Sequence, residues 1–184
     1  MGTMTATEHG PMTRAELDAL PDDGRRHELI DGVLVVTPAP LVRHQAAVMG
    51  LIRLLDAACP QGLRLLTAPV DVALGEDTVV QPDLLVADRE QFTERDLPGA
   101  PLLAIEVLSP STRLIDLNLK KARYEAAGCP SYWVFDPDRV ELTAWELVGD
   151  GYGEPTVVVG DEVFRALQPF AVEVVPSLIV ELER

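Results

Sequence analysis

Apolar and polar positions along this chain predict many short strands and a few helices. Apolar runs of strand length, each ending at turn residues, recur throughout the chain. They cover residues 27–30, 33–36, 63–67, 70–74, 79–86, 102–108, 132–135, 141–147, 156–159 and 170–174, with Pro82 interrupting the fifth. Helical spacing marks residues 13–20, 41–58 and a segment that follows Thr112 and ends before Gly128. This order predicts a mixed α/β or α+β domain with several hairpins.

Two short signals fix where the first elements begin and turn. Thr13 and Glu16 have the spacing of a capping box, so we expect a helix to begin there and to stop before Pro21. Asp31 and Gly32 stand between two apolar runs, which predicts a hairpin with a two-residue turn.

Length and composition indicate a globular chain without a membrane span. Of the 184 residues, 47% are apolar and 24% charged, which is typical of a globular chain, and the length indicates one domain. We expect this domain over residues 12–184 and a flexible tail over residues 1–11. No apolar run approaches the ~20 residues of a membrane helix. Residues 1–11 also lack the regions of a secretion signal. Cys59 and Cys129 are far apart in sequence, and we expect reduced thiols in a cytoplasmic protein.

The charge is the unusual feature of the composition. Fifteen Lys and Arg against thirty Asp and Glu give a net charge of −15, so no overall field attracts nucleic acid. Residues 101–130 differ, because four basic side chains there outnumber three acidic ones. They are Arg113, Lys120, Lys121 and Arg123 against Glu106, Asp116 and Glu125. We therefore expect any contact with a phosphodiester at a local site in this region.

Two acidic residues interrupt apolar runs. Glu106 lies in the run 102–108, which is otherwise apolar on both faces, and Asp83 opens the run that follows Pro82. A lone buried carboxylate costs several kcal/mol unless it is paired or binds a cation. If the two strands are neighbours, both side chains can meet at one spot and hold Mg²⁺ or Mn²⁺. The alternative is that each is an ordinary buried acid paired with an arginine, or an exposed residue at a strand end.

A lysine on the following helix is the candidate basic partner. Asp116, Lys120 and Tyr124 are spaced so that they share one helix face. Near two metal-bound carboxylates, Lys120 could orient an attacking water or stabilise charge on a phosphorane. We expect Lys120 at a surface-type helix position, where alanine would abolish cleavage and leave the fold intact. The alternative is a solvated helix face with an Asp–Lys pair.

Several motifs together resemble the Uma-type family of bacterial restriction-endonuclease-like proteins, in the PD-(D/E)XK nuclease superfamily. The resemblance covers roughly residues 13–182 and rests on segments 27–32, 43–45, 106–112 and 132–137 together with Asp83, Asp116, Lys120, Tyr124 and Gly128. It implies a central mixed sheet flanked by helices, with Asp83 and Glu106 as metal ligands and Glu28 as a third acidic residue. The superfamily's lysine two residues after the glutamate is here Leu108, and the resemblance places that role on Lys120. It also implies a homodimer.

Further residues are candidates for supporting roles. His44 opens the second helix, where its ring could face a phosphate or orient another side chain. Additional candidates for phosphate contact or for supporting the site are Asp116, Arg113, Lys121, Arg123 and Tyr124.

We therefore expect a Mg²⁺- or Mn²⁺-dependent endonuclease that hydrolyses DNA phosphodiester bonds through Glu28, Asp83, Glu106 and Lys120. DNA would bind at a local site despite the acidic net charge. The alternative is a catalytically silent nuclease fold that acts as a dimeric interaction module.

Overall fold

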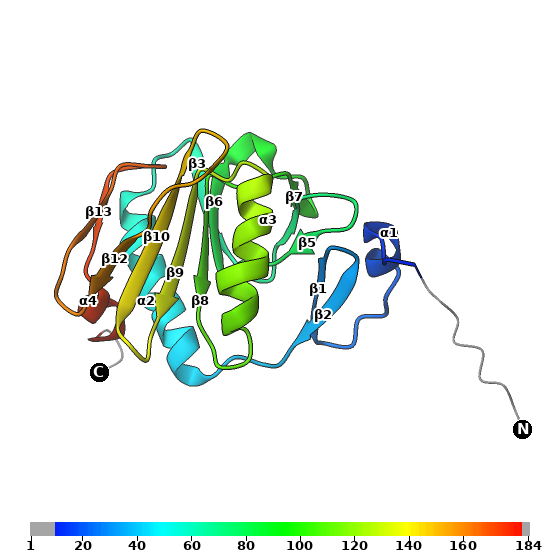
Figure 1. Ribbon diagram of the computed structural model, residues 1–184, viewed down its shortest axis with the longest axis horizontal. Helices are drawn as coiled ribbons and strands as arrows, with labels where there is room; N and C mark the ends of the chain where they lie inside the picture. Colours follow the sequence, from blue (N-terminus) through cyan, green and yellow to red (C-terminus); the bar gives the residue numbers. More distant parts are fainter. Residues whose placement is uncertain (1–9, 182–184) are drawn as a thin grey trace, which may run out of the picture.

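The computed structural model describes residues 10–181 of the chain (Figure 1). Residues 1–9 of the predicted flexible tail lie outside the described residues. Just after them, the Met12 N–H donates to the Gly32 carbonyl over 2.9 Å, which ties the start of the described chain to the first hairpin.

The central sheet is mixed and has seven strands within residues 10–181, in the order β11-β10-β9-β8-β6-β3, with β12 also beside β10. The strands are β3 (Leu63–Thr67), β6 (Leu84–Asp88), β8 (Leu103–Val107), β9 (Ser131–Asp136), β10 (Glu141–Val148), β11 (Gly151–Tyr152) and β12 (Thr156–Val159). The pair β8–β9 is parallel, as expected for two strands joined through a helix. Strand β6 pairs antiparallel with both β3 and β8.

Two smaller sheets stand beside the central one. The first has the order β2-β1-β5-β4-β7, and the second pairs β13 with β14. Their strands are β1 (Arg26–Ile30), β2 (Val33–Thr37), β4 (Asp71–Ala73), β5 (Val79–Val80), β7 (Asp96–Pro98), β13 (Phe164–Ala166) and β14 (Val172–Val174). Figure 1 shows the β1–β2 hairpin beside one end of α3, on the opposite side of the molecule from β13.

Helices cover both faces of the central sheet. They are α1 (Arg14–Asp18), α2 (Val42–Ala58), a π-helical turn over Ile115–Lys120, α3 (Lys121–Ala126) and α4 (Pro176–Glu181), with a 3-10 turn at Arg89–Gln91. Leu51 of α2 shares a core cluster with Ile105, whereas Tyr124 of α3 shares the other large cluster with Ala104. Because neighbouring residues of a strand point to opposite faces, α2 and α3 lie on opposite sides of β8 (Figure 1). In residues 10–181 no helix combines the length and the hydropathy needed to cross a membrane.

The mixed α+β architecture with a central sheet and flanking helices confirms the predicted fold class. The local signals were also correct. Thr13 caps α1 with a full capping box to Glu16. Asp31 and Gly32 both have positive φ, 53° and 74°, as a two-residue hairpin turn requires.

Several short elements were not expected from the sequence, among them β7, β11, β13, α4 and the 3-10 turn at Arg89–Gln91. The polar segment 88–100 contains β7, which pairs in parallel with β4. Strand β13 pairs with β14, and helix α4 follows β14. Strands β7 and β13 have three residues each. This is too few for an alternating pattern to show in the sequence, and the pairing of each strand is fixed by a partner elsewhere in the fold.

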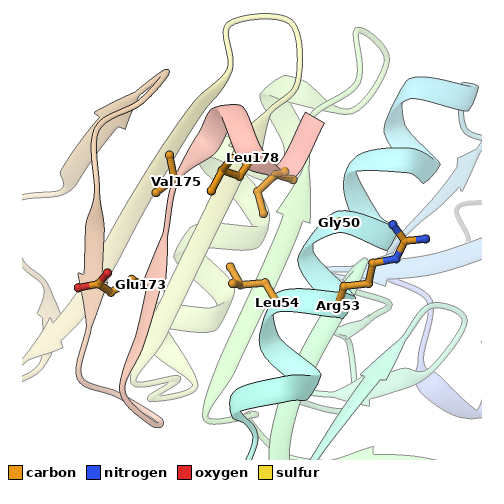
Figure 2. Close-up of a pocket in the computed structure, with 7 residues that line it drawn as sticks. Gly50, Arg53, Leu54, Glu173, Val175 and Leu178 are labelled. Carbon is orange, nitrogen blue, oxygen red and sulfur yellow. The ribbon is translucent and has the colours of Figure 1, made fainter. Parts of the chain in front are cut away.

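A small apolar cavity of about 270 Å³ lies between α2 and the C-terminal segment. Figure 2 shows Leu54 of α2 on one side of it and Val175 and Leu178 on the other, whereas the Arg53 side chain extends away from these two residues. Gly50 marks the closest approach, because a Cβ there would lie 2.5 Å from the Ile179 carbonyl oxygen. Backbone contact between α2 and α4 therefore requires glycine at this position.

Candidate active site

Asp83 and Glu106 lie side by side at the ends of two central strands. The antiparallel register of β6 and β8 pairs Leu84 with Ile105, so the next step pairs Asp83 with Glu106. Leu84 and Ile105 point into the core under α2, and by alternation the two acids start from the opposite face, under α3. The expectation that these strands are neighbours is confirmed.

The Asp83 carboxylate is held by three groups. Its Oδ2 accepts a hydrogen bond from the Val107 N–H over 2.8 Å and lies 3.1 Å from His44 Nε2. Its Oδ1 accepts from Arg26 Nη1 over 3.2 Å. Burial acts to raise the pKa of Asp83, but His44, Arg26 and the Val107 N–H lower it below its ordinary value. Asp83 is therefore an ionised carboxylate near neutral pH.

Lys120 is buried among three carboxylates. Its Nζ lies 2.8 Å from Glu28 Oε1, 3.1 Å from Glu106 Oε1 and 3.6 Å from Asp116 Oδ1. The residue is 2% exposed, so the expectation of a surface-type helix position was wrong. Burial acts to lower the pKa of Lys120, but the charges of Glu106, Glu28 and Asp116 raise it. Lys120 is therefore an ammonium group that donates hydrogen bonds.

The helix that carries Lys120 departs from α-helical geometry at the site. Ile115–Lys120 forms a π-helical turn that continues into α3, and such turns recur at functional sites. Asp116 and Lys120 remain neighbours across this turn and are both buried. The sequence spacing thus identified their common face, although the helix type differs.

Glu28 reaches the site from the five-stranded sheet that contains β1. It lies in β1, where its Oε1 accepts a hydrogen bond from the Gln81 N–H over 2.7 Å as well as contacting Lys120. Arg26 Nη2 is 3.5 Å from the same oxygen. The candidate site is therefore built where the hairpin β1–β2 meets the ends of β6 and β8.

The cluster carries more negative than positive charge. Its acidic members are Glu28, Asp83, Glu106 and Asp116, and its basic members are Lys120 and Arg26. Four carboxylates against two cations leave an excess of two negative charges when all are ionised. Burial raises the pKa of Glu106 well above its ordinary value, although the charge of Lys120 acts to lower it. Of these carboxylates, Glu106 is thus the one whose ionised form a further cation would stabilise most.

A cleft of about 1390 Å³ opens over this cluster. Its walls include the segments 36–41 and 109–112, and its floor includes Glu28, Asp83, Glu106 and Lys120. Pockets for small molecules commonly measure ~300–1,000 Å³. The cleft is therefore larger than a typical small-molecule pocket.

Among residues 10–181, no three His, Cys, Asp or Glu side chains are grouped closely enough to hold a metal ion. The protein's own cations stand between the acids instead. Lys120 lies between Glu106 and Glu28, and Arg26 contacts both Asp83 and Glu28.

Other predicted site residues lie apart from the cleft. Arg113 pairs with Asp136 and Arg123 with Asp31. The Lys121 ammonium lies over the rings of Trp145 and Tyr152, 5.4 and 5.7 Å from their centroids. Of the four cations expected to form a local basic surface, Lys120 lines the cleft and the other three do not.

Tyr124 is fully buried behind the site, and its hydroxyl has no hydrogen-bond partner in the described structure. Burial, with the nearby charge of Glu106, raises the pKa of this hydroxyl well above its ordinary value. Tyr124 therefore packs in the core of the α3 face and does not line the cleft.

Sequence reasoning missed Arg26 and Gln81. The signal for Arg26 is its spacing, because residues 26 and 28 of one strand point to the same face. Gln81 acts through its backbone N–H, for which the sequence holds no signal.

The mixed sheet, with acidic side chains at the ends of two neighbouring strands and a lysine from the next helix, is a restriction-endonuclease-like fold. The chain belongs to the Uma2 family, whose model, described as "Putative restriction endonuclease", matches residues 14–182.

A solved structure shares this fold. It is the crystal structure of a putative nuclease belonging to DUF820 from Anabaena variabilis, with a TM-score of 0.78 and 20% sequence identity. The match covers 94% of this chain and 99% of that chain. A comparison with curated proteins gives no significant match.

Proposed function

We propose that this protein is a divalent-metal-dependent endonuclease that hydrolyses phosphodiester bonds of DNA. One observation carries the proposal: the buried Lys120 joins Glu106 and Glu28 at the floor of a large cleft, beside Asp83. Buried, strongly perturbed ionisable groups in a cleft are concentrated at functional sites. The family to which the chain belongs supports the same reaction class.

Mg²⁺ or Mn²⁺ fits the donor set of the site. Asp83 and Glu106 offer the hard oxygen ligands that these ions prefer, and a dication would balance the excess negative charge of the cluster. Glu28 Oε2 and Asp116 Oδ1 are buried without a hydrogen-bond partner. Asp83 and Glu106 would hold the ion. When bound, it activates water and neutralises charge on the scissile phosphate.

The chain's own residues supply the remaining parts of the reaction. The neighbouring carboxylates raise the pKa of Lys120 in the metal-free protein, and its ammonium group would orient the attacking water or stabilise charge on the phosphorane. Glu28 shapes the site by holding Lys120, and His44 holds the Asp83 carboxylate.

The DNA contact is local. The chain has a net charge of −15, so binding would depend on the few cations of the cleft and fall steeply with salt. The homodimer and the cytoplasmic location stay predictions.

The test is cleavage of plasmid DNA, single-stranded DNA and RNA by the purified protein with Mg²⁺, Mn²⁺ or a chelator. Metal-dependent cleavage of DNA that is lost in Asp83→Asn and kept in Lys121→Ala supports the proposal. Lys121 is the matched control because its ammonium contacts Trp145 and Tyr152, away from the cleft. Absence of cleavage with every metal and substrate would favour the alternative, a catalytically silent interaction module.

A further inference from the structure

Arg26 is the more exposed of the two cations that contact the buried carboxylates of the candidate site. Its side chain is 25% exposed, against 3% for Lys120. Its guanidinium donates to Asp83 Oδ1 over 3.2 Å and lies 3.5 Å from Glu28 Oε1. Arg26 also lines the cleft, so this group lies between the carboxylates and the space open to a ligand.

Arg26 occupies a position that a metal on Asp83 would need. Asp83 Oδ2 is held by the Val107 N–H and lies against His44, whereas Oδ1 is held by Arg26. The Val107 N–H belongs to the backbone of β8, and His44 is packed in α2. The long Arg26 side chain is therefore the partner of Asp83 that can move with least disturbance.

We propose that Arg26 is a positioning residue: it holds Asp83 in the metal-free protein, and a divalent cation displaces its guanidinium from Asp83 onto a phosphate of the substrate. This inference rests on the proposed function, because it assigns to Arg26 a role in the proposed active site. Like charges repel strongly at the separation of two cations on one carboxylate. The displaced group stays in the cleft, where a planar guanidinium can bind two phosphate oxygens at once.

Metal affinity and turnover are then expected to change in opposite directions when Arg26 is neutralised. Without the guanidinium, the metal no longer has to break the contact with Asp83, so Arg26→Gln is expected to bind Mn²⁺ about tenfold more tightly, the usual effect of one charge-assisted hydrogen bond. Cleavage is expected to fall about tenfold or more, because one phosphate contact is missing. A merely structural role would lower both.

The experiment is a calorimetric titration of Mn²⁺ into the full chain and its variants, with cleavage measured in parallel. Arg25→Gln is the matched control for metal binding, because Arg25 also lines the cleft but pairs with Asp23. Its Mn²⁺ affinity is expected to equal that of the wild type. Arg26→Lys keeps the charge, and its affinity is expected to lie between those of the wild type and Arg26→Gln.

A second measurement uses the unmodified protein, in case Arg26→Gln does not fold. The arginine Nε–H signals are followed by NMR while Mg²⁺ is added. The Arg26 signal is expected to move and to saturate with the metal, while the Arg25 signal stays in place.

The outcomes separate this inference from the proposed function. Unchanged or weaker Mn²⁺ affinity in Arg26→Gln, or an Arg26 signal that Mg²⁺ does not move, overturns the role of Arg26. This holds whether or not the wild type cleaves DNA. Absence of metal-dependent cleavage by a wild type that binds Mn²⁺ overturns the proposed function, and the affinity of Arg26→Gln still decides the role of Arg26. If neither the wild type nor Arg26→Gln binds Mn²⁺, the inference is overturned.

Discussion

The Lys120 ammonium donates a hydrogen bond to Glu106 Oε1 over 3.1 Å, and both side chains are almost fully buried. The pair joins the π-helical turn to the end of β8, the strand that immediately precedes this helix. The resemblance to the PD-(D/E)XK superfamily predicts a lysine at position 108, which here is leucine. In this chain the positive charge beside the glutamate therefore comes from the helix.

Lys120→Ala is expected to lose both activity and stability. Losing one charge contact in the transition state lowers the rate ~10²–10³-fold. Removing the cation also leaves Glu28, Glu106 and Asp116 buried together, and breaking such a buried pair costs about 3–5 kcal/mol. Cleavage assays and urea denaturation measure the two effects. Wild-type cleavage by this variant would contradict the proposed mechanism.

Lys121→Ala is the control for that substitution, and Leu108→Lys is the rescue. Lys121 contacts aromatic rings, so Lys121→Ala is expected to lower the free energy of unfolding by about 0.5–1 kcal/mol. Its cleavage activity is expected to stay at the wild-type level. Leu108 follows Glu106 by two residues and starts from the same face of the sheet. Leu108→Lys added to Lys120→Ala is therefore expected to restore part of the activity.

Glu106→Gln is expected to stabilise the metal-free protein at neutral pH. The pKa of Glu106 is raised well above its ordinary value, first by burial and then by neighbouring acids. A raised pKa means that the free energy of unfolding falls as pH rises above the ordinary carboxyl range. The neutral amide avoids this loss. Denaturation in a chelator should show the variant more stable at pH 7 and similar to the wild type near pH 4.

Asp83→Asn is expected to have the opposite effect. Although burial acts to raise the pKa of Asp83, His44, Arg26 and the Val107 N–H lower it. A lowered pKa contributes stability that is present above the ordinary carboxyl range and is lost as pH falls through the folded value. The variant should be less stable at pH 7, and the difference should shrink in acid. If Asp83→Asn and Glu106→Gln changed the free energy of unfolding at pH 7 in the same direction, the two acids would share one environment.

The Cys129 thiol is expected to resist alkylation and to make the fold sensitive to alkali. Burial raises the pKa of Cys129 to about 12. From about pH 9 towards 12 the unfolded chain loses a thiol proton that the folded chain keeps, so the free energy of unfolding falls. At pH 8 a maleimide should label the half-buried Cys59 and spare Cys129 until urea is added. Equal labelling rates in the native protein would contradict the burial.

Gly50→Ala is expected to destabilise the packing of α4 on α2. The new Cβ would lie 2.5 Å from the Ile179 carbonyl oxygen, which belongs to the backbone and must shift. Overpacking of this kind costs about 1–3 kcal/mol, more than the helix propensity that alanine adds. Gly62→Ala is the control, since a Cβ there meets nothing within 4 Å. Urea denaturation compares the two.

Much of the fold was predictable from local signals. A capping box, a two-residue turn and alternating apolar runs act within a few residues, so Thr13, the turn at Asp31 and the long strands could be placed directly. The short β7 and β13 could not, because three residues carry no periodicity and their pairing is fixed by distant partners.

The sequence by itself determined that Asp83 and Glu106 are unusual, because an acid in an apolar run is visible without a structure. Glu28 entered through the family resemblance. Tertiary structure alone decided that Arg26 contacts Asp83, that Lys120 is buried, and that Lys121 points to aromatic rings. The first two depend on how a hairpin near residue 30 docks against strands that follow more than fifty residues later, and the third depends on α3 packing beside β10 and β11. The sequence shows which side chains are ionisable, but the packing of the fold determines their partners and their burial.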